Sequence, residues 1–140
     1  MSDASEPANP KAPPLIVWWV IWLALLVGVV VIYVFLGRGP LPPPVSNPFP
    51  HLIGLVPLFI SILLRWLILP KQRDPAKVLV LFIVGAAMGE GCAILGIFLG
   101  GPFRDELFVL GALGIVQWMP LYARSLYAPA AAGFRPAIER

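Results

Sequence analysis

Four long apolar runs, separated by short polar links, organise this chain. They cover about residues 15–37, 49–69, 77–100 and 106–122. Each run approaches the roughly 20 residues that an α-helix needs to cross the hydrocarbon core of a bilayer. The sequence therefore predicts an all-α integral membrane four-helix bundle, in which residues 15–126 form the transmembrane domain.

The links between the runs predict how the helices connect. Residues 38–48 are proline-rich, residues 71–77 are basic, and residues 100–106 begin with glycine and proline and end with acidic side chains. Short links make consecutive helices antiparallel neighbours, so we expect two antiparallel helical hairpins. Within the second run, Pro57 removes a backbone hydrogen bond and predicts a kink.

The two ends of the chain predict tails rather than further spans. Residues 1–14 are polar and proline-rich, which predicts a disordered N-terminal tail, and residues 127–140 predict a short cytoplasmic C-terminal tail. The first apolar run is about twice as long as the core of a signal peptide, and no small-residue cleavage pattern follows it. We therefore expect this run to remain in the mature protein.

Composition supports the membrane class and limits the partners. Hydrophobic residues make up 59% of the chain, charged residues 12%, and the mean hydropathy is +0.89, which leaves too little polar surface for a soluble domain. The net charge of +3 does not predict nucleic-acid binding, because the basic residues lie at the ends of apolar runs. The expected partners are the lipid bilayer and either further copies of the chain or a membrane partner protein.

The distribution of basic residues predicts the orientation. Arg38 and Arg104 fall on one side of the predicted bundle. The other side collects most of the positive charge, from Lys11, Arg65, Lys71, Arg73, Lys77, Arg124, Arg135 and Arg140. Because cytoplasmic segments are enriched in Lys and Arg, we expect both termini and the middle link to face the cytoplasm.

Glu90 is the most unusual residue of the third run, which has no other acid. A carboxylate at this depth must be protonated, paired or hydrated, which makes it a functional candidate. Ser61, Glu90 and Gln117 each lie about ten to twelve residues from one end of their runs, or roughly 15–18 Å along a helix. This shared depth predicts a midplane polar cluster, in which Ser61 or Gln117 forms a hydrogen bond with protonated Glu90.

Small residues on the third run predict close helix packing. They recur at spacings of three and four and so share one face, formed by Gly85, Gly89, Ala93, Gly96 and Gly100. Such a face lets a second backbone approach closely. Glu90 falls about 100° from the centre of this helix-packing seam and borders it.

Two other polar residues have simpler interpretations. Arg65 lies near the end of the second run, where its long stem is expected to carry the guanidinium outward to the headgroups. His51 is expected to be an interfacial residue, with a pH-sensing or ligand-binding role as the alternative.

The chain resembles small four-span bacterial membrane proteins of uncharacterised function. The resemblance rests on the segment from Trp22 to Tyr33, on the segment around Glu90, and on the ending Trp118-Met119-Pro120. The resemblance implies a location in a bacterial inner membrane and a topology of four spans, but it implies no activity.

A local resemblance links the third run to the rotor-ring proteolipids of rotary ATPases. There, as in the run from Glu90 to Phe98, a carboxylate is followed by small residues, an Ala-Ile pair and a glycine. The resemblance implies proton or sodium binding by Glu90. However, the bulky first run, which includes Trp18 and Trp22, lacks the glycine series of those proteins.

Two hypotheses about function follow from these patterns. No nucleophile, acid pair or phosphate loop predicts catalysis, and the single cysteine, Cys92, with one histidine predicts no metal or other cofactor. The leading hypothesis is a non-enzymatic integral membrane protein, either an accessory subunit or a self-assembling bundle. The alternative is a small oligomeric proton, ion or solute transporter that uses Glu90, with Ser61, Gln117 and Pro57 around it.

Overall fold

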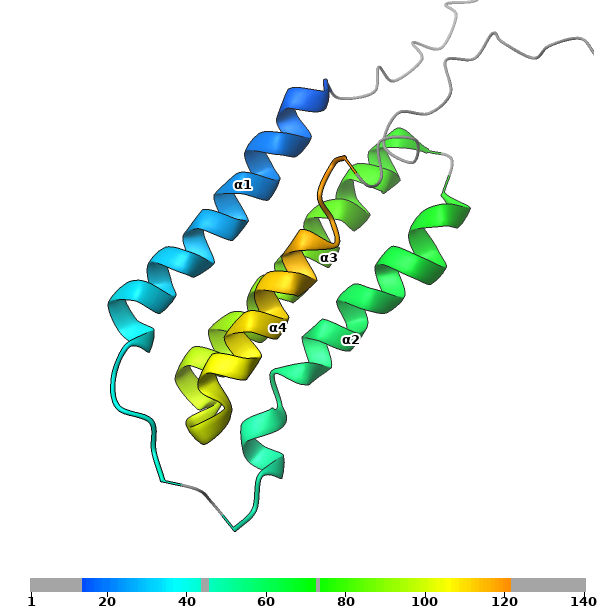
Figure 1. Ribbon diagram of the computed structural model, residues 1–140. Coiled ribbons are helices and arrows are strands. Elements are labelled where there is room, and N and C mark those ends of the chain that lie inside the picture. The colour runs from blue at the N-terminus through cyan, green and yellow to red at the C-terminus, as the bar shows by residue number, and fades with distance from the viewer. Residues whose placement is uncertain (1–13, 44–45, 73, 122–140) are drawn as a thin grey trace, which may run out of the picture.

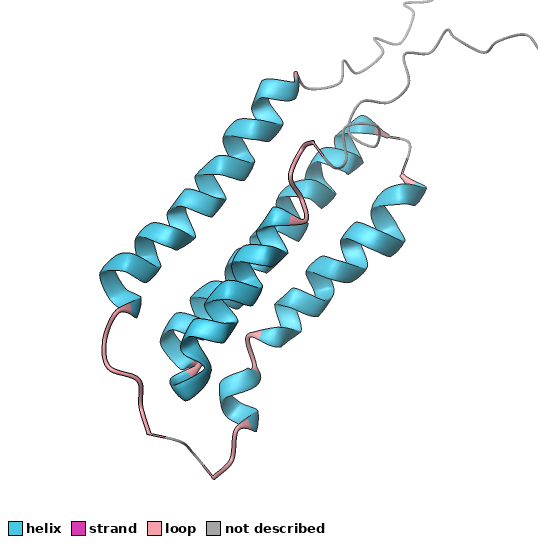
Figure 2. Cartoon of the chain, in the orientation of Figure 1, coloured by secondary structure: helices cyan, strands magenta, loops and turns pink. Residues whose placement is uncertain are grey.

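The computed structural model describes residues 14–43, 46–72 and 74–121, and within these ranges the chain forms helices and turns without any strand (Figures 1 and 2). The predicted all-α class is confirmed. The four α-helices are α1 (Leu15–Ile32), α2 (Leu55–Leu63), α3 (Pro75–Leu99) and α4 (Arg104–Val116).

Shorter helical turns extend these helices. A π-helical turn, Tyr33–Gly37, continues α1, and another, Leu64–Ile68, continues α2. Turns of 3₁₀-helix lie at Phe49–Leu52, Leu69–Lys71 and Gly101–Phe103.

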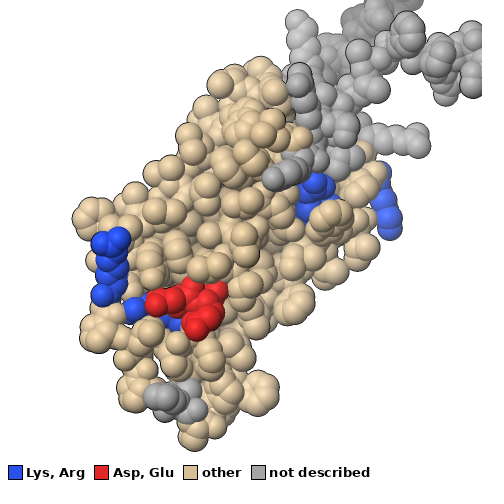
Figure 3. All heavy atoms as spheres, in the orientation of Figure 1, with Lys and Arg blue, Asp and Glu red and all other residues tan. Residues whose placement is uncertain are grey.

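Three helical segments are long and apolar enough to cross a membrane: Leu15–Gly37, Phe49–Lys71 and Pro75–Leu99. They coincide closely with the first three predicted spans. In Figure 3, acidic and basic side chains gather toward the two ends of the visible face, with a band of other residues between them. This distribution matches a bilayer, where charge is tolerated best at the two interfaces.

The fourth helix is shorter than the sequence predicts. The apolar run suggested a span over residues 106–122, but α4 has 13 residues and ends at Val116. Turn-type hydrogen bonds follow, from Trp118 N to Ile115 O at 3.0 Å and from Met119 N to Val116 O at 2.9 Å. Pro120 explains the ending, since a proline disfavours helical geometry in the residue before it and donates no hydrogen bond. A helix of this length rises only about 20 Å, less than the roughly 30 Å of a hydrocarbon core.

The helices pack around the α3–α4 pair. Figure 1 shows α3 and α4 side by side, with α1 and α2 on opposite flanks. The predicted hairpin of the first two helices is therefore wrong, because α1 and α2 each pack against α3 rather than against each other. The side chain of Trp18 fixes α1 on α3, because its ring meets Phe82 edge-on with the centroids 4.9 Å apart. We call the end where α3 begins the Lys77 end, and the end where α4 begins the Asp105 end.

Local sequence signals explain where α3 and α2 begin. Asp74 caps α3 by accepting a hydrogen bond from Ala76 N at 3.0 Å, and Pro75 occupies the first helical position. Pro57 was predicted to kink the second run, but it lies in the first turn of α2, where its missing N–H is not needed. The interruption of this run is the turn at residues 53–54, just before α2 begins.

The remaining domain predictions fall largely outside the described residues. Residues 1–13 and 122–140 carry no structural description. They include all but the last residue of the predicted N-terminal tail, the whole predicted C-terminal tail and the last residue of the fourth predicted span.

Candidate functional site

The helix-packing seam of α3 faces α4 along its length. A Cβ atom added at Gly89 would lie 2.7 Å from the carbonyl carbon of Gly114, and one added at Gly96 would lie 2.5 Å from the Cβ atom of Leu107. Added at Gly85, it would collide with the indole of Trp118. The backbones therefore approach so closely that even a methyl group has no room.

Two glycines of α4 complete this contact. A Cβ atom at Gly111 would lie 2.6 Å from that of Ala93, and one at Gly114 would lie 3.1 Å from Gly89 Cα. The sequence analysis did not assign these residues, although their three-residue spacing in a helix is the signal that could have revealed them. Residues Gly85, Gly89, Ala93 and Gly96 thus meet a matching surface on α4, while Gly100 contacts Arg104, where α4 begins.

Ser61 forms the centre of a polar network beside the end of α4. Its hydroxyl donates to Gly85 O at 2.7 Å and accepts from Trp118 Nε1 at 2.9 Å and from Gln117 Nε2 at 3.1 Å. Ser61 is fully buried, and these bonds use the one donor and both acceptor positions of its hydroxyl. The network joins α2, α3 and the residues that follow α4.

The carbonyl groups at the end of α4 receive further donors from both flanking helices. Trp22 Nε1 of α1 donates to Ile115 O at 2.9 Å, and Arg65 Nε donates to Gln117 O at 3.2 Å. Carbonyl groups at a helix C-terminus lack intrahelical partners and carry partial negative charge. The indole and the guanidinium therefore satisfy and neutralise a helix end that lies inside the bundle.

Arg65 does not extend outward as the sequence analysis predicted. It is only 6% exposed, and its guanidinium carbon lies 5.5 Å from the ring centroid of Trp66 and 5.9 Å from that of Trp118. The prediction was wrong because α4 ends early, which places Gln117 O within reach of Arg65. The cation is stabilised by that carbonyl and by the two aromatic faces.

Glu90 lies apart from Ser61 and Gln117, although all three were predicted to form one cluster. Two of the three are hydrogen-bonded to each other, whereas Glu90 forms no hydrogen bond or ion pair with the described part of the chain. The reason is the position of Glu90 around the axis of α3. Gly89 faces α4, and Glu90 is rotated about 100° from it around the helix axis, toward α1. A Cβ atom at Gly28 of α1 would lie 3.7 Å from Glu90 Oε1, so the half-buried carboxyl group borders the α1–α3 contact.

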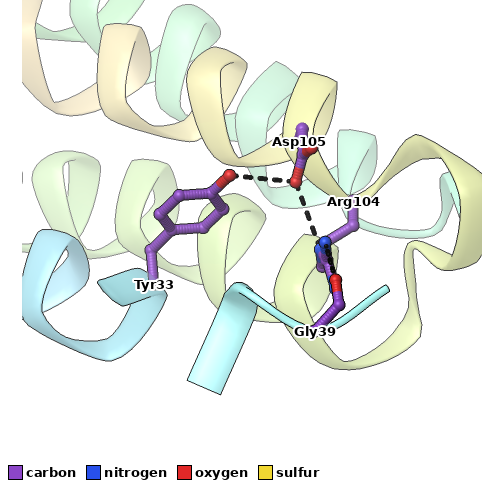
Figure 4. Close-up of polar contacts among 4 residues, drawn as sticks. All are labelled: Tyr33, Gly39, Arg104 and Asp105. Carbon is purple, nitrogen blue, oxygen red and sulfur yellow. Dashed lines mark hydrogen bonds and ion pairs between the residues drawn. The ribbon is translucent and has the colours of Figure 1, made fainter. Parts of the chain in front are cut away.

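A second polar cluster joins α1 to α4 at the Asp105 end (Figure 4). Tyr33 Oη donates to Asp105 Oδ1 at 3.0 Å, and Arg104 Nε donates to the same oxygen at 3.1 Å. Arg104 Nη2 also donates to Gly39 O at 2.7 Å, which fixes the chain that leaves α1. The Tyr33 ring stacks on Phe108 with the centroids 3.9 Å apart. This cluster therefore stabilises the contact between α4 and the end of the first helical segment.

The Tyr33 hydroxyl is expected to contribute little compared with its ring. Tyr33→Phe should lower the free energy of unfolding by less than about 1 kcal/mol, because the hydrogen bond is only partly buried and the stack on Phe108 persists. Tyr33→Ala should cost about 2 kcal/mol or more, since it also removes the ring. Thermal unfolding in detergent would check this order, and equal losses for the two variants would contradict it.

His51 also has a defined structural contact. Its Nδ1 atom lies 2.8 Å from Leu99 O, and because a carbonyl can only accept, this nitrogen carries the hydrogen. The ring lies against Gly101, whose φ of +55° turns the chain between α3 and α4. His51 thus caps the end of α3.

The described residues contain no group of His, Cys, Asp or Glu side chains suited to a metal ion. Comparisons with family models, curated proteins and solved structures find no match. The resemblances to four-span membrane proteins and to rotor-ring proteolipids therefore stay predictions, and any function must be argued from the geometry alone.

Proposed function

We propose that this chain is a non-enzymatic integral membrane protein that assembles with another membrane helix, from a second copy or a partner subunit, through the side of the bundle that carries Glu90. The observation that carries the proposal is the half-buried Glu90 carboxyl group, which borders Gly28 of α1 and has no polar partner among the described residues. Inside a bilayer such a group is stabilised by a donor or acceptor on an adjacent helix.

The packing of α3 on α4 favours assembly over conduction. Their backbones touch at Gly89 and Gly114, which leaves no room for a solute between these two helices. Ser61 and Gln117, which the transport hypothesis needs beside Glu90, bond each other at 3.1 Å instead. The polar side chains inside the bundle thus stabilise the contacts between helices.

We infer that the Lys77 end faces the cytoplasm of a bacterial cell. Lys71 and Lys77 lie at this end, whereas Arg104 at the opposite end is paired with Asp105 at 3.1 Å. The excess of Lys and Arg around the middle link and in the tails supports the same orientation, with both termini cytoplasmic.

Replacing Glu90 is expected to change assembly in a way that depends on hydrogen-bonding capacity. Glu90→Gln should preserve the oligomer, because an amide replaces a protonated carboxyl group with similar shape and bonding. Glu90→Leu should lower the association constant roughly 5- to 30-fold, as expected for an interhelical hydrogen bond of about 1–2 kcal/mol. Native mass spectrometry in lipid nanodiscs at several protein concentrations would measure the effect.

Glu106→Leu is the matched control, because Glu106 is an exposed acid in the first turn of α4. The assembly proposal fails if Glu90→Leu and Glu106→Leu have the same effect. If the wild-type chain remains monomeric, assembly with a second copy is excluded and only assembly with a partner subunit is left. In that case Glu90→Leu must abolish co-purification of a membrane partner, whereas Glu106→Leu must retain it.

A proton or ion transporter is the second candidate, favoured by the half-buried carboxyl group in the middle of α3. In proteoliposomes, this function requires that Glu90→Gln abolish a flux while leaving assembly and detergent stability unchanged. That result would replace the assembly proposal.

A further inference from the structure

A surface groove lies at the Lys77 end, between the end of the second membrane-crossing segment and the first turns of α3. Its volume is about 360 Å³. It is lined by Ile68, Gln72, Ala76, Lys77, Val80 and Leu81. The volume is at the low end of the about 300–1,000 Å³ typical of small-molecule sites, which suits a phosphate group and the first part of one acyl chain.

Both walls of the groove change from polar to apolar in the same direction. On α3, Lys77 lies in the first turn and Leu81 lies one turn deeper. On the opposite wall, Gln72 directly follows the helical segment, which ends at Lys71, and Ile68 lies deeper, within that segment. One turn is about 5.4 Å along the helix axis, so the polar side chains form one layer and the apolar side chains the next.

The apolar part of the groove is open to the surroundings. Val80 is 57% exposed and Ile68 is 40% exposed. These side chains therefore offer surface that no other described element covers. At the depth of a bilayer interface, the component that meets such a surface is a lipid acyl chain.

The charge at the mouth of the groove selects the headgroup. Lys77 lines it, no acidic side chain does, and Lys71 lies exposed at the same end. The nearby Asp74 carboxylate is already engaged, because it accepts from Ala76 N at 3.0 Å. A cation above an apolar groove on the cytoplasmic side matches the way membrane proteins hold anionic lipids.

We propose that this groove binds one anionic phospholipid, with its phosphate at Lys77 and Gln72 and an acyl chain along Ile68, Val80 and Leu81. The proposal rests on the membrane location proposed above, but not on assembly through Glu90. The occupant is a lipid rather than free phosphate, because most of the lining is apolar.

The full chain would be titrated with phosphatidylglycerol or phosphatidylcholine of matched acyl chains, and bound lipid counted by native mass spectrometry. We expect the wild type to bind phosphatidylglycerol at least about fivefold more tightly. Lys77→Gln should remove most of this preference, and Val80→Trp should weaken binding of both lipids by filling the groove. Lys71→Gln, which removes a charge outside the groove, should change binding less than about twofold.

Several outcomes would overturn the proposal. Equal losses from Lys71→Gln and Lys77→Gln would indicate diffuse attraction to the basic end, and unchanged binding by Val80→Trp would show that the groove is not used. Competition by inorganic phosphate at the concentration of the lipid would show that the acyl chain contributes nothing. The same spectra report the oligomeric state, so failure of lipid binding is distinguishable from failure of assembly, and protection of the buried Cys92 thiol verifies that each variant is folded.

Discussion

Gly89→Ala is expected to separate α3 from α4 and to expose Cys92. The added methyl group would lie 2.7 Å from Gly114 C and 2.8 Å from Ile115 N, and both are backbone atoms that cannot move alone. Overpacking of this kind costs about 1–3 kcal/mol, and here it acts where the backbones of α3 and α4 touch. The gain in intrinsic helix preference from glycine to alanine, about 1 kcal/mol, offsets part of this loss.

Cys92 supplies a direct measurement of this separation. It is the single cysteine of the chain, it is fully buried, and its Sγ atom donates to Leu107 O of α4 at 3.6 Å. A thiol at this position reacts with a maleimide only when α3 and α4 move apart. After the gain in helix preference is subtracted, a net loss of up to about 2 kcal/mol should raise the modification rate by up to about 30-fold.

Gly91→Ala is the matched control, because it makes the same change on the same helix, two residues away. A Cβ atom at Gly91 would lie 3.8 Å from that of Pro57, which is ordinary van der Waals contact. This variant should keep Cys92 protected and should match or exceed the wild type in thermal stability. If Gly89→Ala and Gly91→Ala have the same modification rate, the seam does not hold α3 on α4.

The seam could be predicted because it depends on one helix only. Spacings of three and four place Gly85, Gly89 and Gly96 on one face of any regular helix, whatever packs against it. The three segments long and apolar enough to cross a membrane were predictable for a similar reason, since their length and hydropathy are properties of the local sequence. The rotational position of Glu90 followed from the same geometry, but its depth was taken as evidence of contact with Ser61 and Gln117.

The polar network could not be predicted, because it depends on where α4 ends. The apolar run continues beyond Val116, so the sequence indicated a longer helix, and the effect of Pro120 on the preceding turn was not recognised. Once α4 is shortened, its last carbonyl groups need donors inside the bundle. Trp22 and Arg65 supply those donors, although Arg65 was expected to reach the headgroups.

Ser61→Ala should cause the second large effect, because one hydroxyl serves three partners. The substitution removes the acceptor of Trp118 Nε1, which lies 2.9 Å away, and the donor to Gly85 O, which lies 2.7 Å away. Leaving a buried donor unsatisfied costs about 1–3 kcal/mol, although interhelical hydrogen bonds within membranes average nearer 0.6 kcal/mol. We therefore expect a loss of about 1–3 kcal/mol in the free energy of unfolding, measured by denaturant titration in mixed micelles. Ser46→Ala, at an exposed position of the loop between α1 and α2, should have no measurable effect.

A double-mutant cycle with Trp118→Phe separates the hydrogen bond from the general effect of the substitution. Phenylalanine keeps an aromatic ring at a fully buried position but lacks the indole N–H, so the loss of the indole's acceptor no longer adds to the cost when Ser61 is changed in this background. Ser61→Ala should then cost less than it does in the wild type, with a coupling energy of about 0.5–2 kcal/mol. Because the Trp118–Ser61 bond ties the residues after α4 to α2, its loss should also free the end of α4 and raise the reactivity of Cys92. Strictly additive losses would mean that the Trp118–Ser61 hydrogen bond contributes nothing to stability, and that α4 is held on the bundle without help from this bond.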